Sequence, residues 1–203
     1  MLRIEKSQLR AALQCAAKGD IRFQLNSVCM EICANGDMHL IGCDGHSLFA
    51  GRIAANNVRW TEEPQKGGWK MIIPRAAIET ALVPKGFSEL LLSAMPDGRY
   101  SLGDTIFAPV DGQYPDWRRV IPKGNLEVEA AQFNPDLVSR CAKALREWFN
   151  KKDLVTFLRQ HGNNSAIMSG LDNSAFCIVM PRRDDGYYEP FNPAPLTAED
   201  SKE

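Results

Sequence analysis

Several signatures that would place this chain in a class at once are missing. No apolar run approaches the ~20 residues that a membrane helix requires. The opening residues 1–5 carry charge with no apolar signal core behind it. The chain also has no phosphate-binding loop of the form Gly-x-x-x-x-Gly-Lys-Ser/Thr. We therefore expect a cytoplasmic protein that neither contacts a membrane nor binds a nucleotide through such a loop.

Metal-ligating spacings are missing as well. The cysteines stand at positions 15, 29, 33, 43, 141 and 177, among apolar neighbours, and include no Cys-x-x-Cys pair and no nearby histidine cluster. Such spacing argues against a zinc site. The sequence instead predicts reduced, mostly buried thiols that pack as small hydrophobic side chains, and no cofactor.

An excess of charge of either sign is also absent. The chain has 24 Lys and Arg against 25 Asp and Glu, a formal net charge of −1, and 44% hydrophobic residues. This composition is typical of one large or two small globular domains. It argues against a generally basic coat for nucleic acid, but allows positive charge gathered on one face.

A catalytic arrangement is not evident either. His46 stands beside Asp44 and Ser47, but neighbours on one turn seldom aim at one reacting atom. The other histidines, His39 and His161, have no acidic partners at catalytic or metal-binding spacing. The sequence therefore predicts a protein that is not an enzyme.

What the chain does contain is a repeated pattern. A helix over 7–17, with Ser7 as its cap, precedes strands 23–32, 38–43 and 48–53, and a polar loop spans 54–68. Strand 69–73 then leads into a helix opened by Pro74, followed by strands 90–93, 98–102 and 105–110. Finally, strand 126–130 leads into a helix at Asn134-Pro135-Asp136, followed by strands 154–159, 165–169 and 176–180. These are three units of about 60 residues, which indicates internal repetition.

Residues 111–122 form an unusual connector between the second and third units. Asp111-Gly112 predicts a turn, and Pro115 and Pro122 favour extended backbone. The segment also carries two aromatic residues, Tyr114 and Trp117, and the adjacent arginines Arg118 and Arg119. A segment that only spanned a gap would not need these side chains, so we expect it to lie across a surface and pin two parts together.

This connector resembles the interdomain connector of the bacterial DNA polymerase III beta subunit, the sliding-clamp family. That segment runs aromatic-Pro-Asp-aromatic-Arg-Arg-Val-aliphatic-Pro. Other stretches resemble the family in the same order along the chain: residues 22–26, 43–48, 72–75 and 178–181. The resemblance covers most of residues 1–183.

The resemblance implies an α+β fold, the DNA-clamp fold, in which helices cover one face of antiparallel sheets and two units make a domain. Residues 1–122 would form a complete clamp domain that includes the connector, and 123–183 half a domain. The chain would thus be a shortened clamp of about one and a half domains. Residues 184–203, rich in Asp, Glu and Pro, predict a disordered tail; its aromatic start folding back over a groove is an alternative.

A clamp ring of the familiar kind contains twelve such units, so the resemblance implies that four chains of three units would close one. A half-domain without its other half would leave a sheet edge uncovered, which favours association. A homotetrameric ring is our hypothesis, and a dimer that does not close a ring is the alternative.

Clamps of this family act as processivity factors, and their helices line a hole that contacts duplex DNA without reading its sequence. Long basic side chains suit that task because they contact phosphates and permit sliding. The candidate DNA-binding residues are Lys6, Arg10, Arg75, Arg140, Lys143 and Arg146.

The family also implies a groove in which a DNA polymerase or another partner inserts a short peptide motif. An apolar pocket with a few polar groups and an adaptable methionine fits this task. The residues carried over by motif are Leu25, Cys43, Gly45, His46, Leu48, Pro115, Arg119, Val120, Ile178, Val179, Met180, Pro181 and Arg182. The family commonly has Thr at position 43, Arg at 47 and a hydrophobic residue at 182, which leaves the preferred partner open.

Three functions remain after these observations. The first is a processivity factor that encircles double-stranded DNA as a ring, tethers a polymerase, and is placed there with or without a clamp loader. The second is a clamp-derived interaction protein that closes no ring and regulates replication by binding clamp partners or a host clamp. The third is a general DNA-binding regulator, although no base-reading helix stands out.

Overall fold

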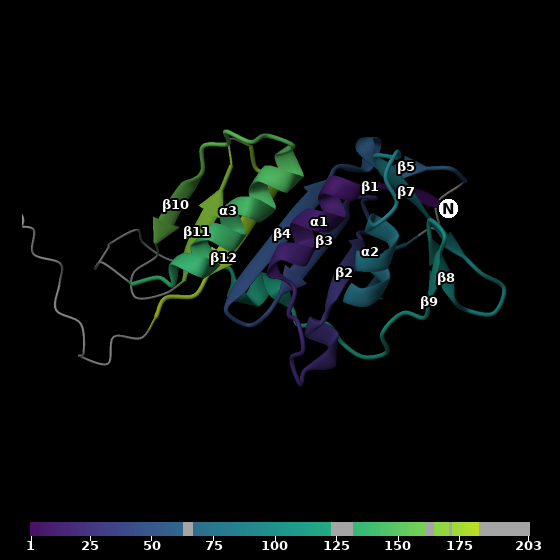
Figure 1. The fold of residues 1–203 in the computed structure, drawn as a ribbon, viewed down its shortest axis with the longest axis horizontal. Coiled ribbons are helices and arrows are strands. Elements are labelled where there is room, and N and C mark those ends of the chain that lie inside the picture. Colours follow the sequence, from purple (N-terminus) through teal and green to yellow (C-terminus); the bar gives the residue numbers. More distant parts are fainter. Residues whose placement is uncertain (63–66, 123–131, 161–164, 171, 183–203) are drawn as a thin grey trace, which may run out of the picture.

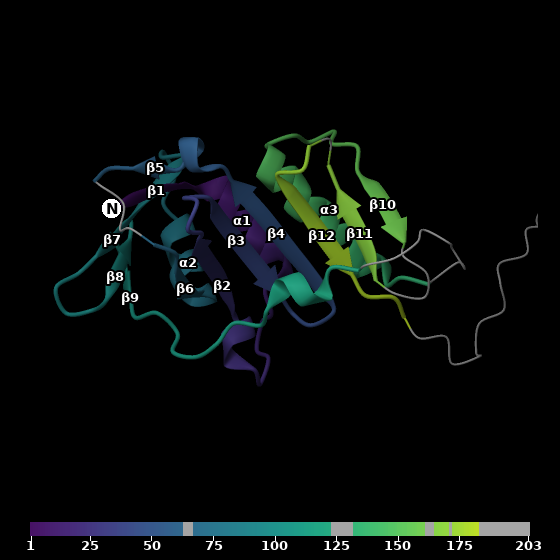
Figure 2. The same ribbon diagram turned by 180° about the vertical axis from the view of Figure 1, so that it is seen from behind.

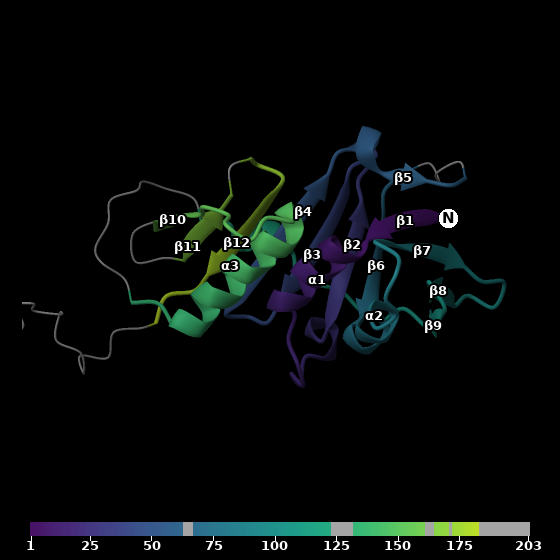
Figure 3. The same cartoon turned by 45° about the horizontal axis from the view of Figure 1, so that its top comes forward.

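The computed structural model describes residues 1–62, 67–122, 132–160, 165–170 and 172–182. Three α-helices lie on one side of two antiparallel sheets, as seen from the front in Figure 1 and from a tilted view in Figure 3. The helices are α1 (Lys6–Cys15), α2 (Arg75–Leu82) and α3 (Pro135–Phe149). No helix among the described residues is long and apolar enough to cross a membrane.

The first two units build both sheets by exchanging strands. Strand β1 (Leu2–Glu5) of the first unit pairs with β7 (Glu89–Ala94), beside β8 (Tyr100–Leu102) and β9 (Thr105–Phe107). Strand β6 (Trp69–Pro74) of the second unit pairs in turn with β2 (Ser27–Ile32), beside β3 (Met38–Cys43) and β4 (Ser47–Ile53). Each of the two units therefore completes the sheet of the other.

The third unit extends the larger sheet. Its strands are β10 (Phe157–Gln160), β11 (Ala166–Ser169) and β12 (Ala175–Val179). Strand β12 pairs with β4 from Ala175 opposite Gly51 to Val179 opposite Ser47. The resulting seven-stranded sheet has the order β10-β11-β12-β4-β3-β2-β6. It therefore contains strands from both sides of the predicted domain boundary at residue 122.

The helix starts follow from local chemistry. Asn134 caps α3, because its side chain accepts a hydrogen bond of 2.9 Å from the backbone N–H of Asp136, and Pro135 follows at the first turn. Helix α1 begins one residue before the predicted cap, since Glu5 and Gln8 form a reciprocal capping box. The prediction of Ser7 as the cap was therefore wrong.

Two glycines allow the helices to lie close to the larger sheet. A Cβ on Gly42 in β3 would stand 1.9 Å from the carbonyl oxygen of Ala12 in α1. A Cβ on Gly51 in β4 would stand 2.4 Å from the Trp148 ring in α3. At Gly42 a side chain would meet backbone, so α1 lies directly against β3; at Gly51 it would meet the Trp148 side chain, so α3 packs closely on β4 through that ring.

Two apolar clusters lie on opposite faces of the larger sheet. The main core packs beneath the helices and includes Phe49, Leu145 and Cys177. The second cluster lies on the other face and consists of Cys29, Ile41, Leu48, Ala50, Trp117 and Ile178, with Cys43, Tyr114, Ile121 and Phe176 packed against it. Because strand residues alternate between faces, the neighbours Cys177 and Ile178 belong to different clusters.

Three local predictions differ from the structure. Phe23–Leu25 forms a 3₁₀ turn rather than the start of a strand, and Trp117–Val120 in the connector forms another where extended backbone was expected. The predicted loop 54–68 contains the short strand β5 (Arg59–Trp60), which pairs with β1. Strand 126–130 and the tail 184–203 lie outside the described residues, and the division into domains at 122 and 183 stays a prediction.

Candidate functional site

The connector lies across the face of the larger sheet that the helices leave open, as Figure 2 shows from behind. Trp117 anchors it: the side chain is 8% exposed and packs over the second apolar cluster. Its ring centroid lies 5.7 Å from that of His39 and 6.2 Å from that of Phe176. Trp117 thus holds the first unit and the third unit under one side chain, as the connector was expected to do.

Glu31 binds the connector through charge. Its carboxylate accepts hydrogen bonds from Trp117 Nε1 at 3.3 Å and from Arg118 Nη1 at 3.0 Å, and Lys70 Nζ lies 3.4 Å away. The Arg118 guanidinium also stacks 4.3 Å above the Trp117 ring. Burial alone would raise the pKa of Glu31, but the bonds from Arg118 and Trp117 lower it, so the carboxylate stays ionised.

The turn between β3 and β4 forms the neighbouring part of the site. Asp44 Oδ1 accepts from the backbone N–H groups of His46 at 2.9 Å and Ser47 at 2.7 Å, which fixes the turn. The backbone N–H of Met180 donates to the His46 carbonyl at 2.9 Å. This contact places the residues after β12 beside the turn, so two of the predicted groove segments meet here.

The predicted groove residues divide into three groups. Leu48 and Ile178 lie opposite one another in the sheet and belong to the buried second cluster. Leu25 and Val179 are buried, at 1% and 0% exposure, and Val179 faces the helices. The surface around the connector presents Gly45, His46, Pro115, Arg119, Val120, Met180 and Arg182, while Cys43 and Pro181 are half-buried.

Val120 and Met180 are the exposed apolar side chains of this set, at 44% and 43% exposure. Val120 ends the 3₁₀ turn of the connector, and Met180 directly follows β12, two residues after the buried Ile178. Exposed apolar side chains next to a buried apolar cluster suit contact with an inserted hydrophobic side chain. Trp117 is the main residue of this surface that was not among the predicted groove residues. Its large aromatic side chain was the feature of the sequence that could have indicated it.

The predicted DNA-binding residues also divide. Lys6 is 4% exposed, and its ammonium donates to the Pro84 carbonyl at 2.5 Å. Arg75 donates to the carbonyls of Leu13, Ala16 and Ala17 at 2.6 to 2.9 Å, and so satisfies the C-terminal end of α1. These two cations hold the second unit to the first, which is a structural task.

Four predicted cations remain on the helical side. Arg10, Lys143 and Arg146 are exposed, and within the described ranges no carboxylate lies within 4 Å of them. Arg140 is half-buried and pairs with Asp44. A hollow of about 740 Å³ brings Arg10, Arg75 and Arg140 together, and its wall includes Lys18, which the sequence analysis missed because it lies beyond the helix.

A group of cysteines also meets at the junction of α1, α3 and β12. The Sγ atoms of Cys15, Cys141 and Cys177 are buried and lie within 4.8 Å of one another. Burial raises the pKa of Cys177, which favours a neutral thiol. Three sulfur atoms could hold a soft metal ion, but within the described part of the chain no fourth Cys, His, Asp or Glu joins them.

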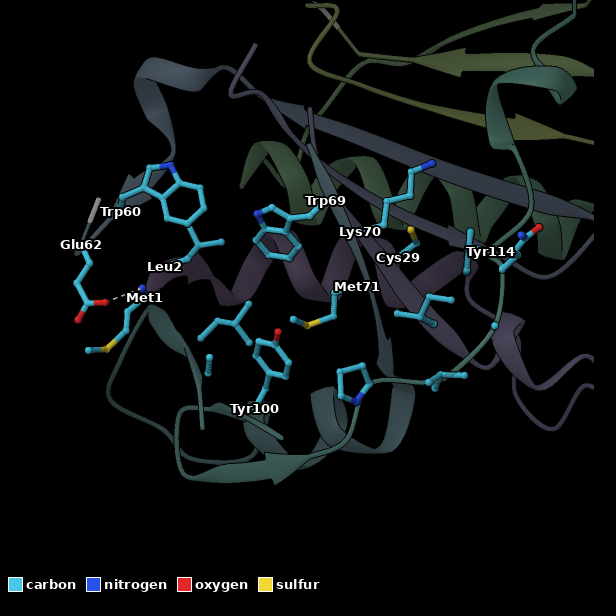
Figure 4. A pocket seen from close by; sticks show the side chains of 17 residues that line it. Met1, Leu2, Cys29, Trp60, Glu62, Trp69, Lys70, Met71, Tyr100 and Tyr114 are labelled. Carbon is cyan, nitrogen blue, oxygen red and sulfur yellow. Dashed lines mark hydrogen bonds and ion pairs between the residues drawn. The ribbon is translucent and has the colours of Figure 1, made fainter. Parts of the chain in front are cut away.

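Another hollow, of about 780 Å³, lies between the two sheets and contains none of the predicted groove residues. Figure 4 shows Trp60, Trp69 and Tyr100 around it, with Lys70 and Glu62 at its margins. Tyr114 of the connector lines one end. Because its walls come from β1, β5, β6, β7 and β8, sequence spacing gave no signal for this hollow.

Comparison with curated proteins places the chain beside bacterial sliding clamps. No protein-family model matches it. It is 27% identical to the beta sliding clamp of Pseudomonas putida over 177 residues, which cover 82% of this chain and 44% of that clamp. It is 32% identical to the beta sliding clamp of Proteus mirabilis over 126 residues, which cover 59% of this chain and 31% of that clamp. The chain thus spans less than half the length of these relatives.

Solved structures agree. The DNA polymerase III subunit beta from Pseudomonas aeruginosa superposes with a TM-score of 0.64 at 17% identity, covering 89% of this chain and 65% of that one. The Helicobacter pylori beta clamp bound to a DNA ligase peptide superposes with a TM-score of 0.68 at 12% identity, covering 90% and 65%. The predicted α+β DNA-clamp fold and the resemblance to beta sliding clamps are confirmed.

Proposed function

Because this chain shares sequence and fold with the bacterial beta sliding clamps, we propose that it is a non-enzymatic clamp-like factor for DNA replication. It binds duplex DNA through its helical side and tethers a partner protein through the groove beside the connector. The carrying observation is the separation of two surfaces. Arg10, Lys143 and Arg146 are exposed on α1 and α3, with no carboxylate within 4 Å among the described residues. The connector lies across the opposite face of the same sheet, over the second apolar cluster (Figures 1 and 2).

The DNA-binding part rests on Arg10, Lys143 and Arg146. Their flexible charged groups suit contacts with phosphates, which are sequence-independent and weaken as salt rises. Arg140 adds to this surface only where DNA competes with Asp44 for the guanidinium. Lys6 and Arg75 are left out of the proposed contact, since their donors are already bound to backbone carbonyls.

Replacing Arg10, Lys143 and Arg146 together by alanine should weaken binding to a 30-base-pair duplex and flatten its salt dependence. Each lost phosphate contact lowers the slope of log K against log salt by about 0.9, so the triple variant should lose about 2–3 units. Fluorescence anisotropy from 50 to 300 mM salt measures this. An Arg59→Ala, Arg99→Ala variant removes exposed charges on β5 and beside β8 and should bind DNA as the unaltered protein does. An unchanged slope in the triple variant would contradict the helical surface.

The groove should accept a clamp-binding peptide, and the DNA ligase peptide bound by the Helicobacter pylori clamp is a suitable probe. Replacing Val120 and Met180 by serine removes these exposed apolar side chains, and we expect at least tenfold weaker binding in a calorimetric titration. An Ile106→Ser variant changes a similarly exposed apolar residue on β9 and should leave the affinity unchanged. Equal affinities in all three proteins would contradict the proposed groove.

Ring closure is the third part of the proposal. The last strands of the first and third units, β4 and β12, already pair within the chain, and β9 is the last strand of the second unit. Within the described residues β9 pairs only with β8 and exposes Ile106, so it offers a second edge of the same kind. Four chains of three units would then supply the twelve units of a ring around DNA.

Retention on DNA tests the ring directly. A closed ring should stay on a nicked circular plasmid during gel filtration and leave once the plasmid is linearised, because it slides off the ends. Loading would use the protein alone and the protein with a clamp loader. Equal loss from circular and linear DNA in both cases would contradict encirclement and favour the alternative, a clamp-derived protein that binds replication partners without closing a ring.

A further inference from the structure

Strand β10 has one uncovered side. It pairs with β11 through four residues, and among the described residues no strand pairs with its other edge. Three large apolar side chains at this edge are exposed: Val155 at 65%, Phe157 at 47% and Leu158 at 46%. An open strand edge with exposed apolar side chains is a template for pairing with another chain.

The first two units show how such an edge is covered in this fold. Strand β2, which follows α1 as β10 follows α3, pairs with β6 of the other unit over six residue pairs. Every residue of β2 is buried. In the same way β1 covers β7, the strand that follows α2, over four pairs. In each of the first two units, therefore, the strand that follows the helix pairs with a strand of the other unit.

We propose that a second copy of this chain covers the outer edge of β10, so that two third units complete one another as the first and second units do. The inference rests on the proposed function, because it names one of the two contacts that a four-chain ring needs. A second copy fits better than an unrelated protein because the exchange between paired units is reciprocal. A twofold axis would cover both exposed β10 edges in one contact.

The exposed apolar side chains of β10 favour the state in which a second strand covers its outer edge. Phe157 and Leu158 are neighbours in a strand, so they point to opposite faces of the sheet, and both are about half exposed. A second strand beside β10 would cover both faces of this edge at once. The pattern differs from that of protected edges, which carry several charges or a proline, since Arg159 is the one charged residue of β10.

The test uses the full 203-residue chain, whose mass is 22.6 kDa. Light scattering on a sizing column, over a hundredfold dilution series, compares the unaltered protein with Phe157→Lys/Leu158→Lys on β10, Ile106→Lys on β9, and all three changes together. We expect four chains for the unaltered protein, two for each edge variant and one for the combined variant. Circular dichroism checks that every variant is folded.

The outcomes separate the β10 contact from the ring. A dimer that becomes a monomer only in the β10 variant supports the contact and contradicts the ring. A mass unaffected by the β10 changes, or a monomer at every concentration, overturns the proposal.

Hydrogen exchange on the unaltered protein gives a second readout that needs no substitution. The amides of β10 that point away from β11 should exchange at least tenfold more slowly in the concentrated than in the dilute sample, and equal exchange would overturn the contact.

Discussion

Replacing Gly42 by alanine is expected to destabilise the chain more than the same change at Gly19 or Gly51. The new Cβ would lie 1.9 Å from the Ala12 carbonyl oxygen and 2.9 Å from the carbonyl carbon. The backbone of either β3 or α1 would therefore have to move. Because α1 is fixed by its own hydrogen bonds and by the core beneath it, we expect a loss on the order of 3 kcal/mol in the free energy of unfolding. Urea denaturation followed by circular dichroism measures it.

The two other glycines serve as controls for this prediction. Gly19 has φ of 79° and open space around it, so Gly19→Ala isolates the cost of a left-handed residue, about 1 kcal/mol. At Gly51 the new Cβ would meet the Trp148 ring, a side chain that can turn away, so Gly51→Ala should cost less than Gly42→Ala and change the tryptophan fluorescence. A Gly42→Ala variant as stable as the Gly19→Ala variant would show that α1 does not lie as tightly on β3 as the structure has it.

Local chemistry explains why most of the elements could be predicted. The helix start at Asn134-Pro135-Asp136 depends on one cap and one fixed backbone angle, and both are encoded within three residues. Strands β3 and β4 consist mostly of apolar residues, and each is preceded by a turn that contains a glycine, Gly36 or Gly45. By contrast β5 has two residues, and it exists only because β1 offers it an edge. Such a strand has no periodicity of its own to detect.

The candidate site could be predicted only in part, because contacts between units decide the role of each side chain. Lys6 and Arg75 both begin a helix, where a charge is ordinarily exposed. Their actual partners, the carbonyls of Pro84 and of Leu13 and Ala16, lie 59 to 78 residues away in the sequence. Basic residues on a helix therefore indicate a DNA-facing surface only after the packing of the neighbouring unit is known.

The same reasoning applies to the groove. The resemblance to the family identified the groove residues by their position in the sequence. Because side chains alternate along a strand, Val179 faces the helices and Ile178 faces the connector. Trp117 was evident as an unusual connector residue, yet its place over Ile41 and Ala50 depends on how the connector crosses the sheet. The buried members of the predicted groove set are thus placed by strand register, while Val120 is placed by the connector.

Replacing Trp117 by alanine is the second change from which we expect a large effect. It would remove a buried indole from the second cluster, at a cost of about 3–5 kcal/mol. Trp117→Phe keeps most of the apolar area but loses the bond from Nε1 to Glu31, and should cost about 1 kcal/mol. The neighbouring Val120 is exposed, so Val120→Ala should change stability by less than about 0.5 kcal/mol. Urea midpoints measure all three, and equal losses in the Ala and Phe variants would contradict a packing role.

The pH dependence of the Trp117 variants separates packing from charge. The folded-state pKa of Glu31 is lowered by Arg118 and Trp117 despite burial, so its contribution to stability is present above the unfolded pKa and is lost as pH falls through the folded one. Trp117→Phe removes one of the groups that lower this pKa, and the loss should therefore begin at a higher pH than in the unaltered protein. Arg118→Gln should shift the loss in the same direction, because it removes the stronger of the two bonds. Urea midpoints from pH 3 to pH 7 measure the shift, and if they fall in parallel for all three proteins, Glu31 does not hold the connector through these bonds.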